Sequence, residues 1–151
     1  MMKNRVLFVL HLFVGIGAIG GGLAAILNPV SPLGITMGAL KQSPFQDYLV
    51  PGILLFVVVG LGNLFAALML RLGSNAQGYV SSVFAWALVI WIVVQCIMMQ
   101  AVAFLHVLFF LIGLVQAGFA AKILFQNHQF PFNIMLDILD KLRGVRRETG
   151  A

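Results

Sequence analysis

Four long apolar runs constrain the fold of this chain more than any other feature of its sequence. They cover about residues 6–27, 48–70, 79–99 and 103–125. Each has about 20 residues, which at about 1.5 Å per helical residue spans a hydrocarbon layer about 30 Å thick. Backbone polar groups in lipid must be paired, so the runs predict helices, and their apolar character on all sides excludes the alternating strands of a membrane barrel. The sequence therefore predicts an all-α fold, an integral membrane four-helix bundle in residues 1–126.

The polar surface of a water-soluble domain is missing from this chain. Hydrophobic residues make up 62% of it and charged residues 9%, whereas soluble domains have about 45–50% and about 25%. So few charges cannot form a water-facing shell around a core of this size. Lipid is therefore expected to be the solvent of the four runs.

The cations indicate an orientation. Lys3 and Arg5 precede the first run, Arg71 closes the second, and Lys122 ends the fourth. Threading four spans places these residues and the four cations of the tail on one side, and only Lys41 on the other. The positive-inside rule makes the first side cytoplasmic, which predicts a cell (inner) membrane protein with both termini in the cytoplasm. The net charge of +5 is thus a topology signal, and no basic face with interleaved aromatic residues favours nucleic-acid binding.

A cleaved secretory signal is the alternative interpretation of the first run. The segment "MMKNRVLFVLHLFVGIGAIGGGLAA" has a basic start, an apolar stretch and small residues near Ala24. A signal core usually has about 7–15 apolar residues, whereas this run is longer and contains His11. Cleavage would leave three spans and place the new N-terminus outside.

Residues 127–151 are predicted to form a cytoplasmic, amphipathic and basic tail. After Asn133, which suits an N-cap, apolar residues recur at helical spacing. A helix that is too short to span and rich in cations is expected to lie in the membrane interface, and a soluble helix packed on a partner protein is the alternative. Contacts with anionic lipid headgroups would come from Lys141, Arg143, Arg146 and Arg147.

The stretch before the second run carries a helix-start signature. Ser43 is expected as the N-cap, Pro44 at the first helical position and Gln46 three residues after the cap. Asp47 would lie in the same first turn, near the positive end of the helix dipole. Pro51 would then remove one backbone hydrogen bond inside the helix, which predicts a bend. In the alternative interpretation, the Asp47 carboxylate serves a functional site at the outer mouth of the bundle.

The two outer connections differ in length. Residues 28–42, "NPVSPLGITMGALKQ", are apolar for a segment that faces water, and are expected either to cover the outer end of the bundle or to enter the headgroup layer. Only a few residues join the third and fourth runs, and Gln100 is the polar one among them. So short a connection predicts an antiparallel hairpin whose two helices are in contact.

Small residues four positions apart mark faces that suit close helix packing. Such faces drive association in lipid because they let two backbones approach closely. They are expected to pack the bundle itself, and a homodimer is the alternative. The pairs and series are Gly17–Gly21, Ala18–Gly22, Gly21–Ala25, Gly62–Ala66 and Gly113–Ala117–Ala121.

Polar side chains within the spans fall into two sets. Counted from the nearest cation at about 1.5 Å per residue, His11 and Gln116 lie about 9 Å and Asn63 about 12 Å from the inner face. Both sets are expected either to form hydrogen bonds between helices or to line a pocket for a small molecule or a lipid headgroup. The second set, toward the outside, consists of Asp47, Trp91, Gln95, Gln100 and His106.

The residues that several known activities of membrane proteins require are missing from this sequence. No Asp, Glu, Lys or Arg lies in mid-span, so the embedded carboxylate of exporters such as the small multidrug-resistance proteins is missing. Cys96 is the one cysteine, which excludes the paired thiols of the vitamin K epoxide reductase type. His11 and His106 lie at different depths and so cannot share a haem. No metal-ligand spacing or nucleophile–base pair occurs, and we expect a non-enzymatic protein without cofactor or metal.

Three tracts resemble a group of small multi-pass bacterial proteins of uncharacterised function. They are "SPFQDYLVPGILLFVVVGLGN", "WIVVQCIMMQ" and "LFFLIGLVQ", and the similarity covers about Asn28 to Phe125. The resemblance implies a bacterial inner membrane. Because the group has no established activity, it assigns no site residue.

The expected function is therefore non-enzymatic. The chain is expected to bind an apolar ligand or a lipid, or to act as an accessory subunit that associates with a larger membrane protein. The alternative is a minimal transporter or permease component for a small or lipophilic substrate.

Overall fold

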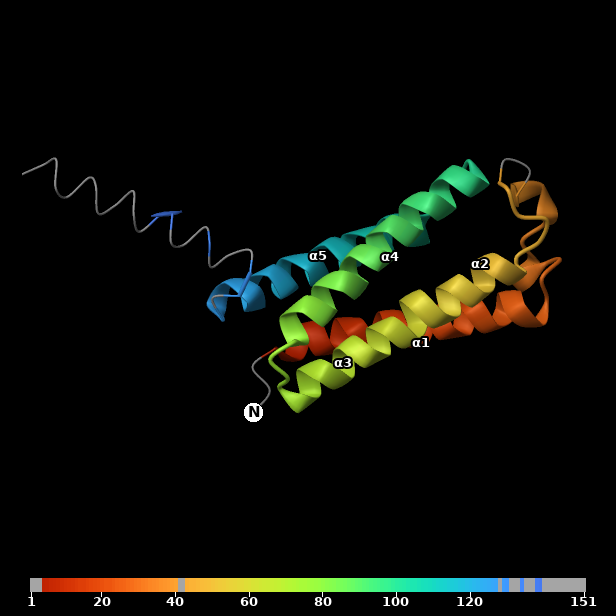
Figure 1. Cartoon of the computed structure of the whole chain (residues 1–151). Coiled ribbons are helices and arrows are strands. Elements are labelled where there is room, and N and C mark those ends of the chain that lie inside the picture. The colour runs from red at the N-terminus through yellow and green to blue at the C-terminus, as the bar shows by residue number, and fades with distance from the viewer. Residues whose placement is uncertain (1–3, 41–42, 128, 131–133, 135–137, 140–151) are drawn as a thin grey trace, which may run out of the picture.

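The structure is a computed structural model that describes residues 4–40, 43–127, 129–130, 134 and 138–139. All regular elements of these residues are helical (Figure 1). They are α1 (Arg5–Leu27), the short turns η1 (Pro32–Gly34) and η2 (Met37–Leu40), α2 (Leu49–Leu54), η3 (Leu55–Leu61), α3 (Gly62–Leu72), α4 (Gln77–Met99) and α5 (Phe104–Gln126).

Four continuous helical segments are long and apolar enough to cross a membrane. They are α1, the joined segment Leu49–Leu72 formed by α2, η3 and α3, α4 and α5. Their bounds lie within a few residues of the four apolar runs, so the predicted all-α architecture with four long apolar helices is confirmed. The side chains that face outward are mostly large and apolar, as expected of helices surrounded by lipid.

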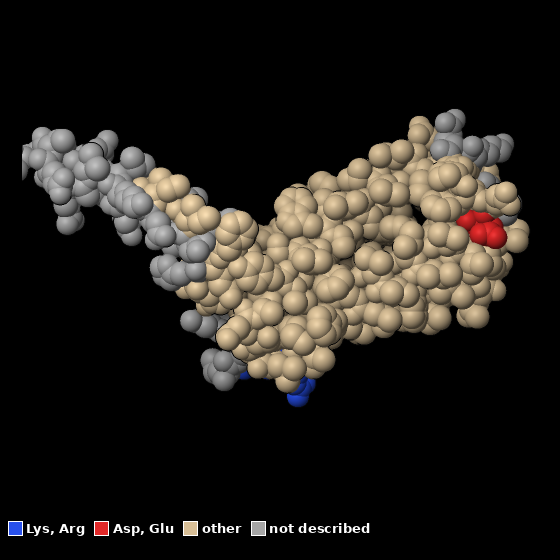
Figure 2. Space-filling model, viewed as in Figure 1, with Lys and Arg blue, Asp and Glu red and all other residues tan. Residues whose placement is uncertain are grey.

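The four segments run alternately up and down, so that the start of α1 and the end of α5 lie at the same end of the bundle (Figure 1). We call this the basic end, because Arg5, Arg71 and Lys122 lie there. The opposite end, which we call the loop end, holds residues 28–40, residues 43–48 and the turn 100–103. Asp47, which is the one acidic residue in the described part of the chain, lies at the loop end (Figure 2).

Glycines bring α1 into close contact with the second segment. A Cβ atom on Gly22 would lie 2.8 Å from the backbone nitrogen of Phe56 and 2.9 Å from the carbonyl oxygen of Gly52. A Cβ on Gly52 would in turn lie 2.7 Å from Cβ of Ala25. All three distances are too short for a real side chain, so the two backbones can approach this closely only through glycine. Gly22 and Ala25, which belong to the predicted pairs Ala18–Gly22 and Gly21–Ala25, therefore pack against the second segment within the bundle.

Helices α4 and α5 form the antiparallel hairpin that the short connection predicts, and they are in contact along their length. Gly113 of α5 faces Val89 and Ala85 of α4, at a place where a Cβ would lie 2.7 Å from Cγ2 of Val89. The predicted hairpin is thus confirmed. This pair of helices diverges from the other two toward the loop end (Figure 1).

The connection between α1 and α2 fills the opening between the diverging pairs. Leu40 and Tyr48 of the connection are buried together with Ala25 of α1 and Met98 of α4. The Tyr48 hydroxyl donates a hydrogen bond to the carbonyl of Thr36 (3.0 Å), and its backbone N–H donates to the carbonyl of Pro29 (2.9 Å). The connection therefore covers the loop end, which is the first of the two positions expected for it.

The run 48–70 places the second long helix correctly, whereas the helix start predicted at Ser43 is wrong. The helix begins at Leu49 instead of after Ser43, and Asp47 precedes it, accepting a hydrogen bond from the N–H of Leu49 (3.0 Å). Ser43 forms a local turn with Phe45 instead. Residues 43–48 cannot be helical while Tyr48 is fixed to Pro29 and packed into the covering cluster. Pro51 consequently lies in the first helical turn, where its missing N–H costs no helical hydrogen bond.

A π-helical segment, η3, lies in the middle of the second span. Residues Leu55–Leu61 have the wider turn in which backbone N–H groups bond to the carbonyl five residues earlier, as between Gly62 and Val57. The sequence analysis did not predict this segment. The predicted tail helix with Lys141, Arg143, Arg146 and Arg147 lies outside the described residues, apart from isolated positions such as Ile138.

Candidate functional site

Three helices contribute a polar cluster to the interior of the bundle. His11 of α1, Asn63 of α3 and Gln116 of α5 are all fully buried. His11 Nδ1 lies 2.7 Å from Asn63 Oδ1, and Gln116 Nε2 lies 3.3 Å from the same oxygen. Asn63 Nδ2 also donates to the carbonyl of Val59, at 2.8 Å. The structure thus brings together the three side chains that the sequence places at one depth.

The hydrogen bonds of this cluster determine its donors and acceptors. Asn63 Nδ2 donates to Val59, so Oδ1 is the acceptor, and His11 Nδ1 must carry the proton that it donates to Oδ1. Gln116 Nε2 donates to the same oxygen. His11 Nε2 and Gln116 Oε1 then remain as acceptors, and neither has a partner among the described residues. The buried Ser81 hydroxyl on α4 also lacks one.

A cavity of about 320 Å³ lies between the two helix pairs, nearer the loop end than the polar cluster. We call it the interhelical cavity. Its volume is at the lower end of the range of small-molecule pockets, about 300–1,000 Å³. Its lining is almost wholly apolar and contains no charged side chain. Apolar wall residues include Val14, Gly17 and Gly21 of α1, Leu55 and Val59 of η3, and Leu88 of α4.

Three polar residues of the predicted outer set line this cavity, namely Trp91 and Gln95 of α4 and His106 of α5. His106 Nδ1 accepts a hydrogen bond from the N–H of Ala103 (3.0 Å), which caps the start of α5. In the neutral ring the proton must then be on Nε2, which makes that nitrogen a donor. Neither Gln95 nor Trp91 Nε1 has a hydrogen-bond partner among the described residues, and Trp91 Nε1 is buried.

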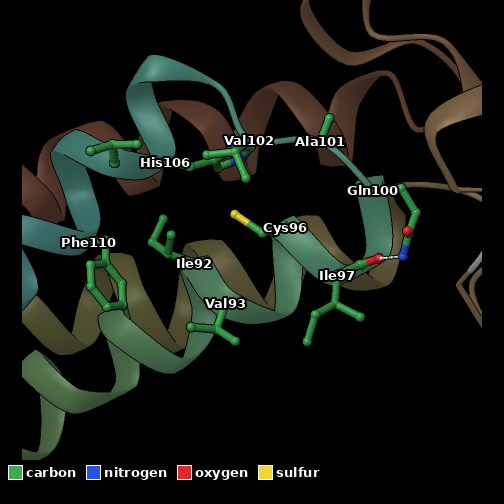
Figure 3. A pocket seen from close by; sticks show the side chains of 10 residues that line it. Ile92, Val93, Cys96, Ile97, Gln100, Ala101, Val102, His106 and Phe110 are labelled. Carbon is green, nitrogen blue, oxygen red and sulfur yellow. Dashed lines mark hydrogen bonds between the residues drawn. The ribbon is translucent and has the colours of Figure 1, made fainter.

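The other two members of the outer set lie elsewhere. Gln100 lines a second, more open pocket of about 580 Å³ between the loop-end parts of α4 and α5, in which it donates to the carbonyl of Ile97 (2.8 Å) (Figure 3). His106 borders both pockets. Cys96 points into the second pocket from α4 (Figure 3). Asp47 lines neither pocket and caps α2, so the outer set does not form one site.

The polar cluster and the interhelical cavity are neighbours along the helices. Val14 of the cavity wall follows His11 by three residues, and Val59 of the wall supplies the carbonyl that Asn63 binds. Val14, Val59 and Leu88 also belong to the buried apolar core. A single apolar layer therefore separates the cavity from the His11–Asn63–Gln116 cluster.

Sequence reasoning missed two features of the site. Ser81 was not among the predicted polar residues, although its spacing from the buried Ala85 and Leu88 places it on the inward face of α4. Leu55 and Val59 could not be assigned to a cavity wall, because the π-helical turn rotates the residues of η3 relative to an α-helix. No group of three or more His, Cys, Asp or Glu side chains lies together among the described residues.

Comparison of the chain with protein-family models, with curated proteins and with solved structures found no match. The resemblance to small bacterial membrane proteins therefore stays a prediction. An apolar cavity with a few hydrogen-bond donors can hold a lipophilic molecule. His106 is the titratable side chain of its lining, and no nucleophile lies beside it there.

Proposed function

We propose that this chain is a non-enzymatic, multi-pass protein of the bacterial inner membrane that binds a lipophilic molecule in the interhelical cavity. The ligand is a membrane lipid or another apolar compound. The basic end faces the cytoplasm, because Arg5, Arg71 and Lys122 lie there and cytoplasmic ends of membrane proteins carry an excess of cations.

The observation that carries this proposal is the interhelical cavity itself. Helices in lipid normally pack closely through small residues, yet Gly17 faces the cavity and a Cβ on it would meet only Phe109, at 3.7 Å. The two helix pairs are held apart at the loop end by the packed connection around Leu40 and Tyr48. The space between them is thus maintained by the fold and bordered by apolar groups.

A matched pair of glycine substitutions tests the proposal. In Gly17→Leu the new side chain would occupy the cavity, whereas in Gly20→Leu it would point away from the bundle, where no atom lies within 4 Å of the Cβ position. Native mass spectrometry after gentle detergent extraction should show a small molecule or lipid retained by the unchanged chain and by Gly20→Leu, and lost from Gly17→Leu. Equal retention by all three would refute binding in this cavity.

Transport of such a ligand is a second candidate function, and the π-helical segment favours it. Leu55 and Val59 of η3 line the cavity, and π-helical turns recur at functional sites where a helix changes its register. The purified chain in liposomes should then move a lipophilic substrate between leaflets without any partner. An accessory subunit, by contrast, should be inert alone and should copurify with a larger membrane protein or with a second copy of this chain.

A further inference from the structure

We infer that the molecule in the interhelical cavity is an uncharged amphiphile whose hydrogen-bond-accepting oxygen binds His106 Nε2 and the Gln95 amide, with its alkyl chain directed toward the polar cluster. An ester or ketone oxygen has this chemistry. The inference rests on the proposed function, and it adds the class of ligand and the direction in which the ligand lies.

The first support is the distribution of polar groups along the cavity. Gln95 precedes the end of α4 at Met99 by four residues, about 6 Å, and His106 follows the start of α5 by two residues, about 3 Å. Both therefore lie near the loop end of the cavity. The opposite end is formed by Val14, Val59 and Leu88, which are buried and apolar. A ligand that matches this gradient has its polar end at the loop end.

The second support is the kind of polar group. The Nδ1 atom of His106 accepts the N–H of Ala103, so Nε2 of the neutral ring carries a proton that it can donate. The Gln95 side chain has no partner among the described residues and offers two further N–H groups. Both side chains line the loop-end part of the same cavity. Their donors favour a ligand with an acceptor, because an unpaired donor next to an apolar ligand would lose its hydrogen bond to water without replacement.

The third support is the absence of compensating charge. None of the residues that line the cavity is Asp, Glu, Lys or Arg. A carboxylate or an ammonium group would have to give up its hydration without an ion-pair partner, which disfavours charged ligands strongly. The acceptor is therefore expected on a neutral group. Its depth near the loop end fits both the ester of a bilayer lipid and a free amphiphile with a shorter chain.

Three probes of similar size separate these requirements. Methyl octanoate has an alkyl chain and a neutral ester, decane has a chain alone, and octanoate has a chain and a charge. The shift of the melting temperature of the detergent-solubilised chain is measured with each. We expect methyl octanoate to stabilise the chain most, and its affinity to exceed that of either other probe by about three- to tenfold, which is the effect of one good hydrogen bond.

Two substitutions remove the donors. In His106→Asn the shorter side chain keeps an acceptor for the N–H of Ala103 and loses the Nε2 donor. Gln95→Leu breaks no hydrogen bond with the described residues, so it serves as the test if His106→Asn does not fold. Each should reduce the response to methyl octanoate to that of decane. Gln126→Leu, on an exposed position at the basic end of α5, is the matched control and should respond as the unchanged chain does.

The outcomes distinguish this inference from the proposed function. If methyl octanoate and decane stabilise equally, the cavity binds apolar molecules and the assigned acceptor is wrong. A preference for the ester that survives both Gln95→Leu and His106→Asn would also overturn it. If no probe stabilises the chain, the proposed function and this inference fail together. Native mass spectra of the gently extracted chain then identify the source, because a retained phospholipid and a smaller neutral amphiphile differ in mass.

Discussion

Asn63 is the residue on which the buried polar cluster depends. Its Oδ1 accepts hydrogen bonds from His11 and Gln116, and its Nδ2 binds the carbonyl of Val59. One amide thus connects α1, η3, α3 and α5. Loss of this side chain would leave two buried donors without a partner, which costs more than the bonds themselves contribute.

Replacement of Asn63 by leucine should therefore destabilise the bundle. We expect the free energy of unfolding to fall by about 1–3 kcal/mol, the cost of leaving buried polar groups unpaired. It can be measured by titrating the detergent-solubilised chain with a denaturing detergent. Asn75→Leu, in the exposed turn before α4, is the control and should change stability little. Equal effects of the two substitutions would show that the cluster does not stabilise the fold.

The same cluster predicts coupling between its members. His11→Phe and Asn63→Leu each remove the same hydrogen bond, so the double variant should lose less stability than the sum of the two single variants. The expected coupling is about 0.5–3 kcal/mol, which is typical of residues in one network. Gln116→Leu combined with Asn63→Leu should behave likewise. Strict additivity in both cycles would contradict the hydrogen bonds described above.

At the scale of residues, the sequence predicted the depth of the polar side chains but not the hydrogen bonds between their atoms. The fixed rise of a helix sufficed to place His11, Asn63 and Gln116 at one depth. It could not show that Asn63 is central, which follows from side-chain rotation. The sequence also could not show that Asp47 lies apart from the cavity-lining members of the outer set. The position of Asp47 follows from the packing of its neighbour Tyr48, which is buried with Leu40 and bonded to the carbonyl of Thr36.

At the scale of elements, the glycine contact between α1 and the second segment sets their separation. In Gly22→Ala the new methyl group would lie 2.8 Å from a backbone nitrogen and 2.9 Å from a backbone oxygen, so the helices must move apart. We expect a loss of about 1–3 kcal/mol in the free energy of unfolding. Gly20→Ala should instead be neutral or stabilising by up to about 1 kcal/mol, because no atom lies near its Cβ position. Thermal unfolding of the two variants measures the difference.

The π-helical segment η3 should tolerate the deletion of one residue. The hydrogen-bonded turn of a π-helix contains one residue more than that of an α-helix. Deletion of Val57, an exposed residue of η3, would therefore let this segment become α-helical. The residues of α2 and α3 on either side would still face the same neighbours. Deletion of Ile90, an exposed residue of α4, would rotate the following half of that helix by about 100°.

We therefore expect the Val57 deletion to leave a folded chain with a smaller change in melting temperature than the Ile90 deletion, as measured by circular dichroism in detergent. Comparable unfolding by both deletions would argue against the extra residue in η3. The segment itself could not be predicted from the sequence, because its residues are as apolar as those of the neighbouring α-helical turns.

For the whole molecule, the four long apolar helices followed from the length and hydropathy of the runs. Backbone in lipid must pair within helices or closed barrels, and these runs lack the alternation of barrel strands. The orientation in the membrane stays a prediction, as do the interfacial tail with Arg143, Arg146 and Arg147 and its contact with anionic lipid. The hydropathy of the run 48–70 placed the second long helix correctly, but the capping signature of Ser43 did not, because packing at the loop end keeps residues 43–48 out of the helix.

Cysteine labelling in intact cells tests the orientation. In a Cys96→Ala background, Ser31→Cys places a thiol at the loop end, and Asn75→Cys places one in the turn at the basic end. A membrane-impermeant maleimide should label the first in intact cells and the second only after permeabilisation, since the positive-inside rule directs the basic end to the cytoplasm. The reverse pattern would invert the assigned topology.

The interhelical cavity reaches the outer surface of the bundle at Gly17, about 18 Å along α1 from Arg5. A hydrocarbon-soluble guest would thus enter sideways from the bilayer and never cross water. Partitioning from water into the bilayer would already concentrate such a molecule around the protein, so weak binding would be enough to keep the cavity occupied. Occupancy of the cavity would then depend on the mole ratio of this molecule to lipid. A titration plotted against aqueous concentration would give an apparent affinity that changes with the amount of membrane in the sample.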